Sequence, residues 1–357
     1  MTEPKKRPGL EALHEAHRLA VAPFAFQSVA SLKALGILAL LDKHFGVGLT
    51  EEAIATTLKL DAYTLSLLLP AGEVFGVLER HDDRWDLSRV GYFLLNDPLV
   101  KVNFDFTQDV CYTGLAYLTE SLKTQSPAGL KVFGDWESIY PHLRDLPEPA
   151  KTSWFAFDHY YSDNAYRDVL PIVFREGVKH LVDIGGNTGK WALACTQYDK
   201  DVHVTICDLP PQCETALANA KDAGVGDRID ACPMDLLAGK PLPVLSAQVW
   251  WMSQFLDCFA PSEVISILKR VHDAMDDNAT LYILEPLTDQ QPYEAGRVAL
   301  VALSIYFTTM ANGNSRFYSL EDFRAFLAAA GFELCAVHAG VGAHSSLLEC
   351  VKTGRSQ

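Results

Sequence analysis

The sequence predicts an α/β protein whose second half is a doubly wound, mostly parallel sheet closed by an antiparallel hairpin. From residue 180 onward, apolar strand-like runs alternate with helical segments, which is the pattern of a parallel sheet. Two final strand-like runs, 332–337 and 345–351, flank a turn that contains Gly340 and Gly342. A glycine turn after one strand and an acid after the next indicate a nucleoside site at the carboxyl ends of the strands.

The pattern also predicts the individual elements of this half. The expected strands are 180–184, 202–207, 229–233, 247–252 and 279–284, and the expected helices are 189–199, 210–222, 261–275, 293–311 and 319–330. The segment 106–165 is helical and aromatic, so we expect it to bridge the two halves and to line a pocket. We therefore divide the chain into domains 1–105, 106–165 and 166–357.

The first domain is predicted to be helical, closed by a short hairpin at 77–87, as in a winged helix. Thr50 has the position of a helix N-cap. Winged helices often bind DNA, but the candidate recognition helix, 62–75, contains no Lys or Arg, so a DNA-binding regulator is the weakest hypothesis. The stretch 24–41 is apolar nearly all round, which predicts a helix buried in a homodimer interface.

Composition excludes several classes of partner. A net charge of -15 disfavours nucleic acid and anionic membranes, because both are themselves negative. We find no signal-like apolar region near the start and no apolar run long enough to span a membrane. The eight cysteines form no C-x-x-C pair, so we expect reduced thiols, no metal site and a cytoplasmic location.

The run LVDIGGNTG at 181–189 is the most informative motif. Read from Gly185, a dinucleotide fingerprint would need glycines where Asn187 and Lys190 stand. The pattern D-x-G-x-x-x-G instead favours S-adenosylmethionine, a nucleoside ligand without phosphates. Asp208, at the end of the next strand, is placed to accept hydrogen bonds from both ribose hydroxyls. The alternative is an ordinary strand–turn–helix without a ligand.

These features resemble the S-adenosylmethionine-dependent small-molecule O-methyltransferases, which join a winged-helix-like dimerisation domain to a domain of class I methyltransferase fold. The motifs that carry the resemblance are 182–189, 207–210, 247–259 and 327–332. The resemblance implies that the methionine part, the ribose and the adenine of the cofactor are held mainly by residues after the first three strands. The implied cofactor-binding residues are Asp183, Gly185, Gly186, Asn187, Gly189, Asp208, Leu209, Asp235, Leu236 and Ser253.

The catalytic part departs from the family pattern. Ser-Gln at 253–254 replaces the usual Lys and Trp, and Asp-Cys at 257–258 stands where the family has its catalytic His-Asp pair. One of the two family acids that orient the His matches Glu285, and the other falls on Phe317. The implied substrate-contacting residues are Phe157, Tyr161, Phe307, Met310 and Asn312. This altered segment resembles a bacterial branch of the family associated with aromatic polyene pigments.

The reaction needs a group that accepts the proton of the acceptor hydroxyl. Asp257, supported by Glu285, is our first candidate, because burial and a neighbouring like charge would raise the pKa of its carboxyl. Asp257 could instead cap the following helix, and His159 is an alternative base. We expect O-methylation of a hydroxylated aromatic molecule, free or carrier-linked. Methylation of the aryl carbon and a non-methylating enzyme of the hydroxylase or decarboxylase kind stay open as alternatives.

Overall fold

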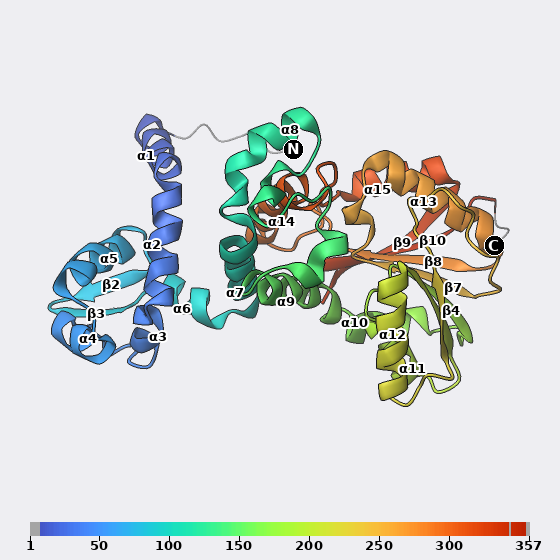
Figure 1. Cartoon of the computed structure of the whole chain (residues 1–357), viewed down its shortest axis with the longest axis horizontal. Coiled ribbons are helices and arrows are strands. Elements are labelled where there is room, and N and C mark those ends of the chain that lie inside the picture. The colour runs from blue at the N-terminus through green and yellow to red at the C-terminus, as the bar shows by residue number, and fades with distance from the viewer. Residues whose placement is uncertain (1–7, 343, 355–357) are drawn as a thin grey trace. The chain divides into compact units, whose positions relative to one another are not determined.

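The computed structural model describes residues 8–342 and 344–354, except the side chain of Ser162. It divides into two compact units, Met1–Gln108 and Asp109–Gln357 (Figure 1). Within the described ranges, no helix combines the length and apolar character that crossing a bilayer requires.

The first unit packs short helices around a three-stranded sheet with strand order β1-β3-β2. The predicted hairpin forms, and Leu78 pairs with Leu87 across it. The Thr50 side chain accepts a hydrogen bond from the N–H of Ala53, so this residue caps its helix as predicted. The elements are α1 Gly9–Ala20, α2 Ala22–Ala34, α3 Ile37–Asp42, β1 Leu49–Thr50, α4 Glu51–Leu58, α5 Ala62–Val74, β2 Leu78–His81, β3 Arg84–Leu87, α6 Arg89–Asn96 and α7 Pro98–Phe106.

The prediction of one continuous buried helix over 24–41 is wrong. Gly36 lies between α2 and α3 with a φ of 78°, a conformation that glycine adopts without steric cost and that ends the first helix. Leu32 and Ile37 are fully buried in the core of this unit. Phe24 is 72% exposed. The apolar stretch therefore fills the unit's own core at one end and leaves an apolar surface at the other.

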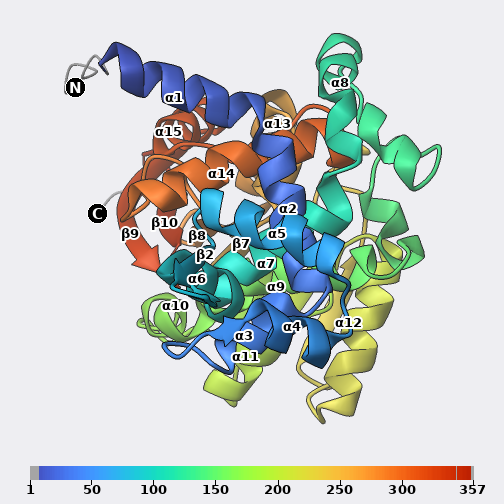
Figure 2. The same ribbon diagram turned by 90° about the vertical axis from the view of Figure 1, so that its left-hand side faces the viewer.

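The second unit contains a seven-stranded sheet with order β6-β5-β4-β7-β8-β10-β9, which confirms the predicted fold class. β4 to β8 are parallel, and β10 is antiparallel to both β8 and β9. Figure 2 shows β9, β10, β8 and β7 following one another across the sheet. The strands are β4 His180–Ile184, β5 His203–Asp208, β6 Ile229–Pro233, β7 Val249–Ser253, β8 Thr280–Glu285, β9 Phe332–Val341 and β10 Ser345–Lys352.

Alternate residues of these strands face two helical layers. Val182, Trp250 and Ile283 belong to one core cluster, together with buried residues of α13 and α15. Leu181 and Trp251 belong to the other, together with residues of α10, α11 and α12. Nearly continuous apolar runs are expected for strands that are covered on both faces. These helices are α10 Tyr166–Val173, α11 Lys190–Tyr198, α12 Pro210–Asp222, α13 Pro261–Ala274 and α15 Leu320–Ala330.

The remaining helices of this unit precede β4 or follow β8 in the chain. The single helix predicted over 293–311 is α14 followed by one π-helical turn, Phe307–Ala311. A 3-10 turn, η4, covers Tyr140–Asp145. The other helices are α8 Leu118–Thr124, α9 Ala150–Asp163 and α14 Glu294–Tyr306.

Candidate active site

The site lies where the order of the parallel strands reverses. β4 pairs with β5 on one side and with β7 on the other, so the loops that follow β4 and β5 leave the sheet in opposite directions. In open α/β sheets, ligands bind in the crevice that such a reversal creates at the carboxyl ends of the strands. The loop after β4 is the predicted glycine turn, 185–189.

The glycines of this turn have different roles. Gly185 has a φ of 75°, and a Cβ there would overlap the ring of Phe255. A Cβ at Gly186 would lie 2.6 Å from Oδ2 of Asp183, so the turn is closely packed from both sides. Gly189 packs behind the turn, where a Cβ would lie 3.0 Å from Ala216. It does not line either of the two hollows described in the next paragraphs. Its predicted cofactor contact is therefore replaced by a packing role.

Asp208 is held at the end of β5 by two backbone donors. Its Oδ2 accepts from the N–H of Asn187 at 2.8 Å, and its Oδ1 accepts from the N–H of Leu209 at 2.6 Å. A carboxylate has about four lone-pair sites, so both oxygens keep accepting capacity. Asp208, Leu209 and Asn187 all line the same cavity, so that capacity is available to a ligand.

This cavity, of about 430 Å³, extends from the glycine turn to the segment after β7. Its volume lies within the usual range of small-molecule sites. One part of its wall contains Asp208, Asp235 and Leu236, and another contains Asp257 and many aromatic residues. The aromatic residues of the wall are Tyr140, Trp154, Phe157, Tyr161, Phe255, Phe259, Tyr306, Phe307 and Phe317.

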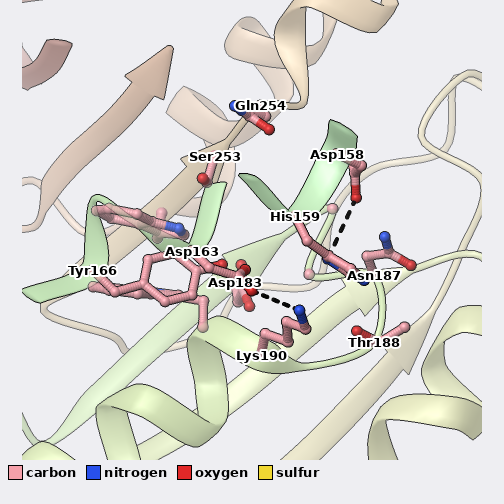
Figure 3. Close-up of a pocket in the computed structure, with 14 residues that line it drawn as sticks. Asp158, His159, Asp163, Tyr166, Asp183, Asn187, Thr188, Lys190, Ser253 and Gln254 are labelled. Atoms are coloured by element: carbon pink, nitrogen blue, oxygen red, sulfur yellow. Dashed lines mark hydrogen bonds and ion pairs between the residues drawn. The ribbon is translucent and has the colours of Figure 1, made fainter. Parts of the chain in front are cut away.

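A smaller recess of about 70 Å³ adjoins the glycine turn (Figure 3). Asp183, Gly186 and Ser253 line it, together with His159 and an ion pair in which Nζ of Lys190 lies 2.6 Å from Oδ2 of Asp163. The recess and the cavity share four lining residues. These are Asp158, Gly185, Asn187 and Gln254.

Recess and cavity together suit an adenosyl amino acid. Oδ2 of Asp183 and Oγ of Ser253 are buried without a hydrogen-bond partner, and both residues line the recess. Burial, followed by the charge of Asp208, raises the pKa of Asp183 to about 8. Buried polar atoms are usually hydrogen-bonded, so buried polar atoms without a partner next to a cavity indicate a ligand group that would bind there. The residues present therefore fit S-adenosylmethionine.

Three carboxyl groups meet at the other end of the cavity. Asp257 is 5% exposed, and its pKa rises to about 7 because it is buried and because Asp158 is nearby. Glu285 accepts from the N–H groups of Phe255 and Leu256, at 3.1 and 2.9 Å, and so fixes the backbone next to Asp257. Burial and then Asp257 raise the pKa of Glu285 well above its ordinary value.

The like charge beside Asp257 has two sources. Asp158 raises the pKa of Asp257 by repulsion, and the mutual repulsion of Asp257 and Glu285 raises the pKa of Glu285 well above its ordinary value. Glu285 is the more deeply buried acid, at 1% exposure, and burial is the largest cause of its raised pKa. It is placed to position Asp257 through the backbone.

Asp257 does not cap the following helix. The N-cap of α13 is Ala260, whose N–H donates to Oε2 of Glu263 at 2.8 Å. Asp257 lies in a separate 3-10 turn, Leu256–Cys258, where its Oδ1 accepts from Sγ of Cys258 at 3.4 Å. The capping alternative is therefore wrong, and the carboxyl group of Asp257 lines the cavity.

The alternative base, His159, lies in the recess and not among the residues that line the large cavity. Its Nδ1 is 3.9 Å from Oδ2 of Asp158, as Figure 3 shows. Burial and then the charge of Lys190 lower the pKa of His159. His159 faces the cofactor side of the site.

The predicted substrate residues divide into two groups. Phe157, Tyr161 and Phe307 line the cavity. Met310 is fully buried instead, against Gly114 and Gly129, whose missing side chains leave room for its sulfur.

Asn312 does not line the cavity either, because its amide binds the catalytic segment. Its Nδ2 donates to the carbonyl oxygen of Cys258 at 2.5 Å, and its Oδ1 accepts from Ser315 at 2.9 Å. Asn312 therefore supports the turn that carries Asp257, so the predicted direct contact with the substrate is replaced by a contact with the backbone.

Asp158 is the main functional residue that sequence reasoning missed. It is a half-buried acid on α9, and desolvation followed by the charge of Asp163 raises its pKa to about 7. A signal for it exists, because Trp154, Asp158 and Tyr161 follow the i, i+4, i+7 spacing of one helix face. An acid on an aromatic face is unusual unless it has a polar role.

The comparisons with known proteins agree with the fold. An O-methyltransferase domain matches residues 161–333, and a Dimerisation2-like domain matches residues 14–85. L-tyrosine C(3)-methyltransferase of Streptomyces lavendulae is 25% identical over 312 residues, covering 86% of this chain and 83% of that protein. The 3-hydroxy-5-methyl-1-naphthoate 3-O-methyltransferase of Streptomyces sahachiroi is 27% identical over 246 residues, covering 68% and 69%.

Among solved structures, the S-adenosylmethionine-dependent methyltransferase SibL has a TM-score of 0.75 at 20% identity and covers 95% of this chain and 99% of that one. The fold and the site thus define a class I methyltransferase with an N-terminal dimerisation domain. Residues 161–333 are an O-methyltransferase domain of the S-adenosylmethionine-dependent kind, and S-adenosylmethionine is the cofactor.

Proposed function

We propose that this enzyme methylates a hydroxylated aromatic small molecule of secondary or pigment metabolism, with the hydroxyl oxygen as the favoured acceptor. One observation carries the proposal. A single cavity is lined both by Asp208, next to the glycine turn, and by Asp257, a buried carboxyl group whose pKa is raised to about 7. A base with a pKa near the working pH is the most effective proton acceptor.

Different residues of the cavity would bind the cofactor and the acceptor. Asp208 would hold the ribose of the cofactor, with Asp235 and Leu236 beside the adenine and Asp183 and Ser253 at its amino-acid end. When bound, S-adenosylmethionine supplies an electrophilic methyl group. The aromatic walls orient a flat acceptor and exclude water. Orientation of this kind can contribute roughly 7–11 kcal/mol to lowering the barrier.

Asp257 would accept the proton of the acceptor hydroxyl. A phenol has a pKa of about 10 and is mostly protonated at neutral pH. An ordinary aspartate would be too weak a base, and burial next to Asp158 removes this obstacle. Glu285 keeps the turn that carries Asp257 in place through its two backbone hydrogen bonds.

The test begins with the cofactor. S-adenosylhomocysteine is titrated calorimetrically into the wild-type protein and into the Asp208→Ala variant. We expect the variant to bind it at least about tenfold more weakly, because two hydrogen bonds to a charged group are lost. Hydroxylated aryl acids and their thioesters are then screened with S-adenosylmethionine. A protein that binds no adenosyl ligand would contradict the proposal.

Carbon methylation is the second candidate, and one observation favours it. The relative that matches 86% of this chain is named as a C(3)-methyltransferase of L-tyrosine. An ionised phenol is also nucleophilic at its ortho carbon, so the same base serves both reactions. Proton NMR of the product separates the two, because methoxy and aryl-methyl protons resonate in different regions.

We also propose that the enzyme is a cytoplasmic homodimer. Residues 14–85 match a Dimerisation2-like domain, and α1 and α2 expose an apolar surface. This surface contains Leu10, Leu13, Leu19 and Phe24. Contiguous exposed apolar surface is typical of an interface. The free thiols of all eight cysteines support a reducing compartment.

A further inference from the structure

All the charged side chains that line the cavity among the described residues are acidic. Four aspartates line it, Asp158, Asp208, Asp235 and Asp257, and among the described residues of its wall none is Lys, Arg or His. Small-molecule sites that recognise a carboxylate usually offer Arg or another cation to it.

Two basic side chains next to the cavity are engaged elsewhere. Lys190 is paired with Asp163 in the recess next to the glycine turn. Arg144, on η4, donates to the hydroxyl of Thr215. Neither of these two basic side chains lines the cavity.

A third basic residue, Arg270, contacts the backbone of the cavity wall. It donates to the carbonyl oxygens of Leu236 and Lys240, and it does not line the cavity. An anion in the cavity would therefore lose its water without gaining a countercharge.

The position of the acids strengthens this argument. Asp158 and Asp257 line the cavity together with Phe157, Tyr161 and Phe307, which would supply apolar contacts to a flat acceptor. A carboxylate on the acceptor would be both desolvated by these aromatic rings and repelled by the two acids. An uncharged or cationic group meets neither cost.

We infer that the cavity selects hydroxyaryl acceptors whose side chain carries no free carboxylate, such as esters, thioesters, amides or amines, and rejects the corresponding free acids. This inference rests on the proposed function and names its substrate class. A thioester is also the form in which a carrier protein presents an acyl group.

The test measures binding, so that it does not depend on turnover. The protein is saturated with S-adenosylhomocysteine at pH 7.5 and titrated calorimetrically with four probes of equal ring structure. The probes are 3-(4-hydroxyphenyl)propanoic acid, its methyl ester, its N-acetylcysteamine thioester and tyramine. We expect the three probes without a carboxylate to bind about tenfold or more tightly than the acid. Tighter binding of the thioester than of tyramine would indicate a carrier-linked acyl substrate. Tighter binding of tyramine would indicate a free amine.

A charge variant with a matched control tests the cause. Leu143 is half-buried on η4 and lines the cavity. Leu143→Lys adds a cation to the wall, and we expect it to reduce the preference for the ester over the acid by about tenfold. Leu143→Met changes the shape similarly without a charge and should leave the preference unchanged.

The outcomes separate this inference from the proposed function. Acid binding as tight as ester binding overturns the inference, and so does a failure of all four probes to bind while S-adenosylhomocysteine binds. An equal change in both Leu143 variants overturns the electrostatic cause. Tight ester binding without any methylated product refutes the proposed function and leaves the selectivity of the cavity standing.

Discussion

Asp257→Asn is the substitution that tests the proposed chemistry most directly. Asparagine has nearly the same shape as aspartate but accepts no proton at neutral pH. The side chain is buried, and its pKa of about 7 is due to burial and to Asp158. The change therefore removes a base from the cavity while leaving the packing of the 3-10 turn almost intact.

The expected loss follows from that pKa. At pH 7 about half of the Asp257 groups are ionised, so the wild-type enzyme has a useful base in the cavity. A positioned general base contributes roughly 10²–10⁴-fold to the rate. Removing it should lower kcat by that factor, which corresponds to about 3–5 kcal/mol of transition-state stabilisation.

The assay follows methyl transfer at saturating S-adenosylmethionine between pH 5.5 and 9. Because the ionised form of Asp257 is the active one, wild-type turnover should rise as the pH passes through about 7 and then level off. The variant should lose this rising limb. Asp227→Asn is the matched control, because Asp227 is exposed and does not line the cavity.

One result would refute this reasoning. If Asp257→Asn binds S-adenosylhomocysteine normally and turns over within about threefold of the wild type, Asp257 is not the base. A variant that has lost cofactor binding does not meet this condition, so binding is measured first.

Three further predictions concern the turn, the buried acid and the interface. Gly185→Ala should weaken S-adenosylhomocysteine binding at least about tenfold in calorimetry, because a Cβ there overlaps Phe255 and the φ is positive. The control Gly226→Ala should bind normally, because the atom nearest to its Cβ lies 3.5 Å away. The pKa of Asp183 is about 8 in the folded protein and 3.8 ordinarily, so the folded state binds this proton more tightly than the unfolded state does. The stability of the wild type should therefore fall as the pH rises from about 4 to 8. Asp183→Asn should make the Tm depend less on pH over this range, and a Tm that falls as steeply as in the wild type would contradict the prediction. Phe24→Glu should shift the light-scattering mass of the protein toward the monomer, and a monomeric wild type would refute the dimer itself.

The sequence by itself determined the parts of this protein that depend on local pattern. The alternation of strands and helices predicted the sheet and the closing hairpin, and the glycine turn with Asp208 predicted the cofactor site. Thr50 caps its helix as predicted, because an N-cap depends only on residues three or four positions away. Such features are set by backbone conformation and by near neighbours along the chain.

The tertiary structure alone decided the chemical environment of the acids. Burial, and then Asp158 on α9, raise the pKa of Asp257. Burial at the end of β8, and then Asp257, raise the pKa of Glu285. Met310 belongs to the core because Gly114 and Gly129, far away in the sequence, leave a space for it. Burial and charge at a site depend on which distant segments pack against it, and a local pattern contains no information about that packing.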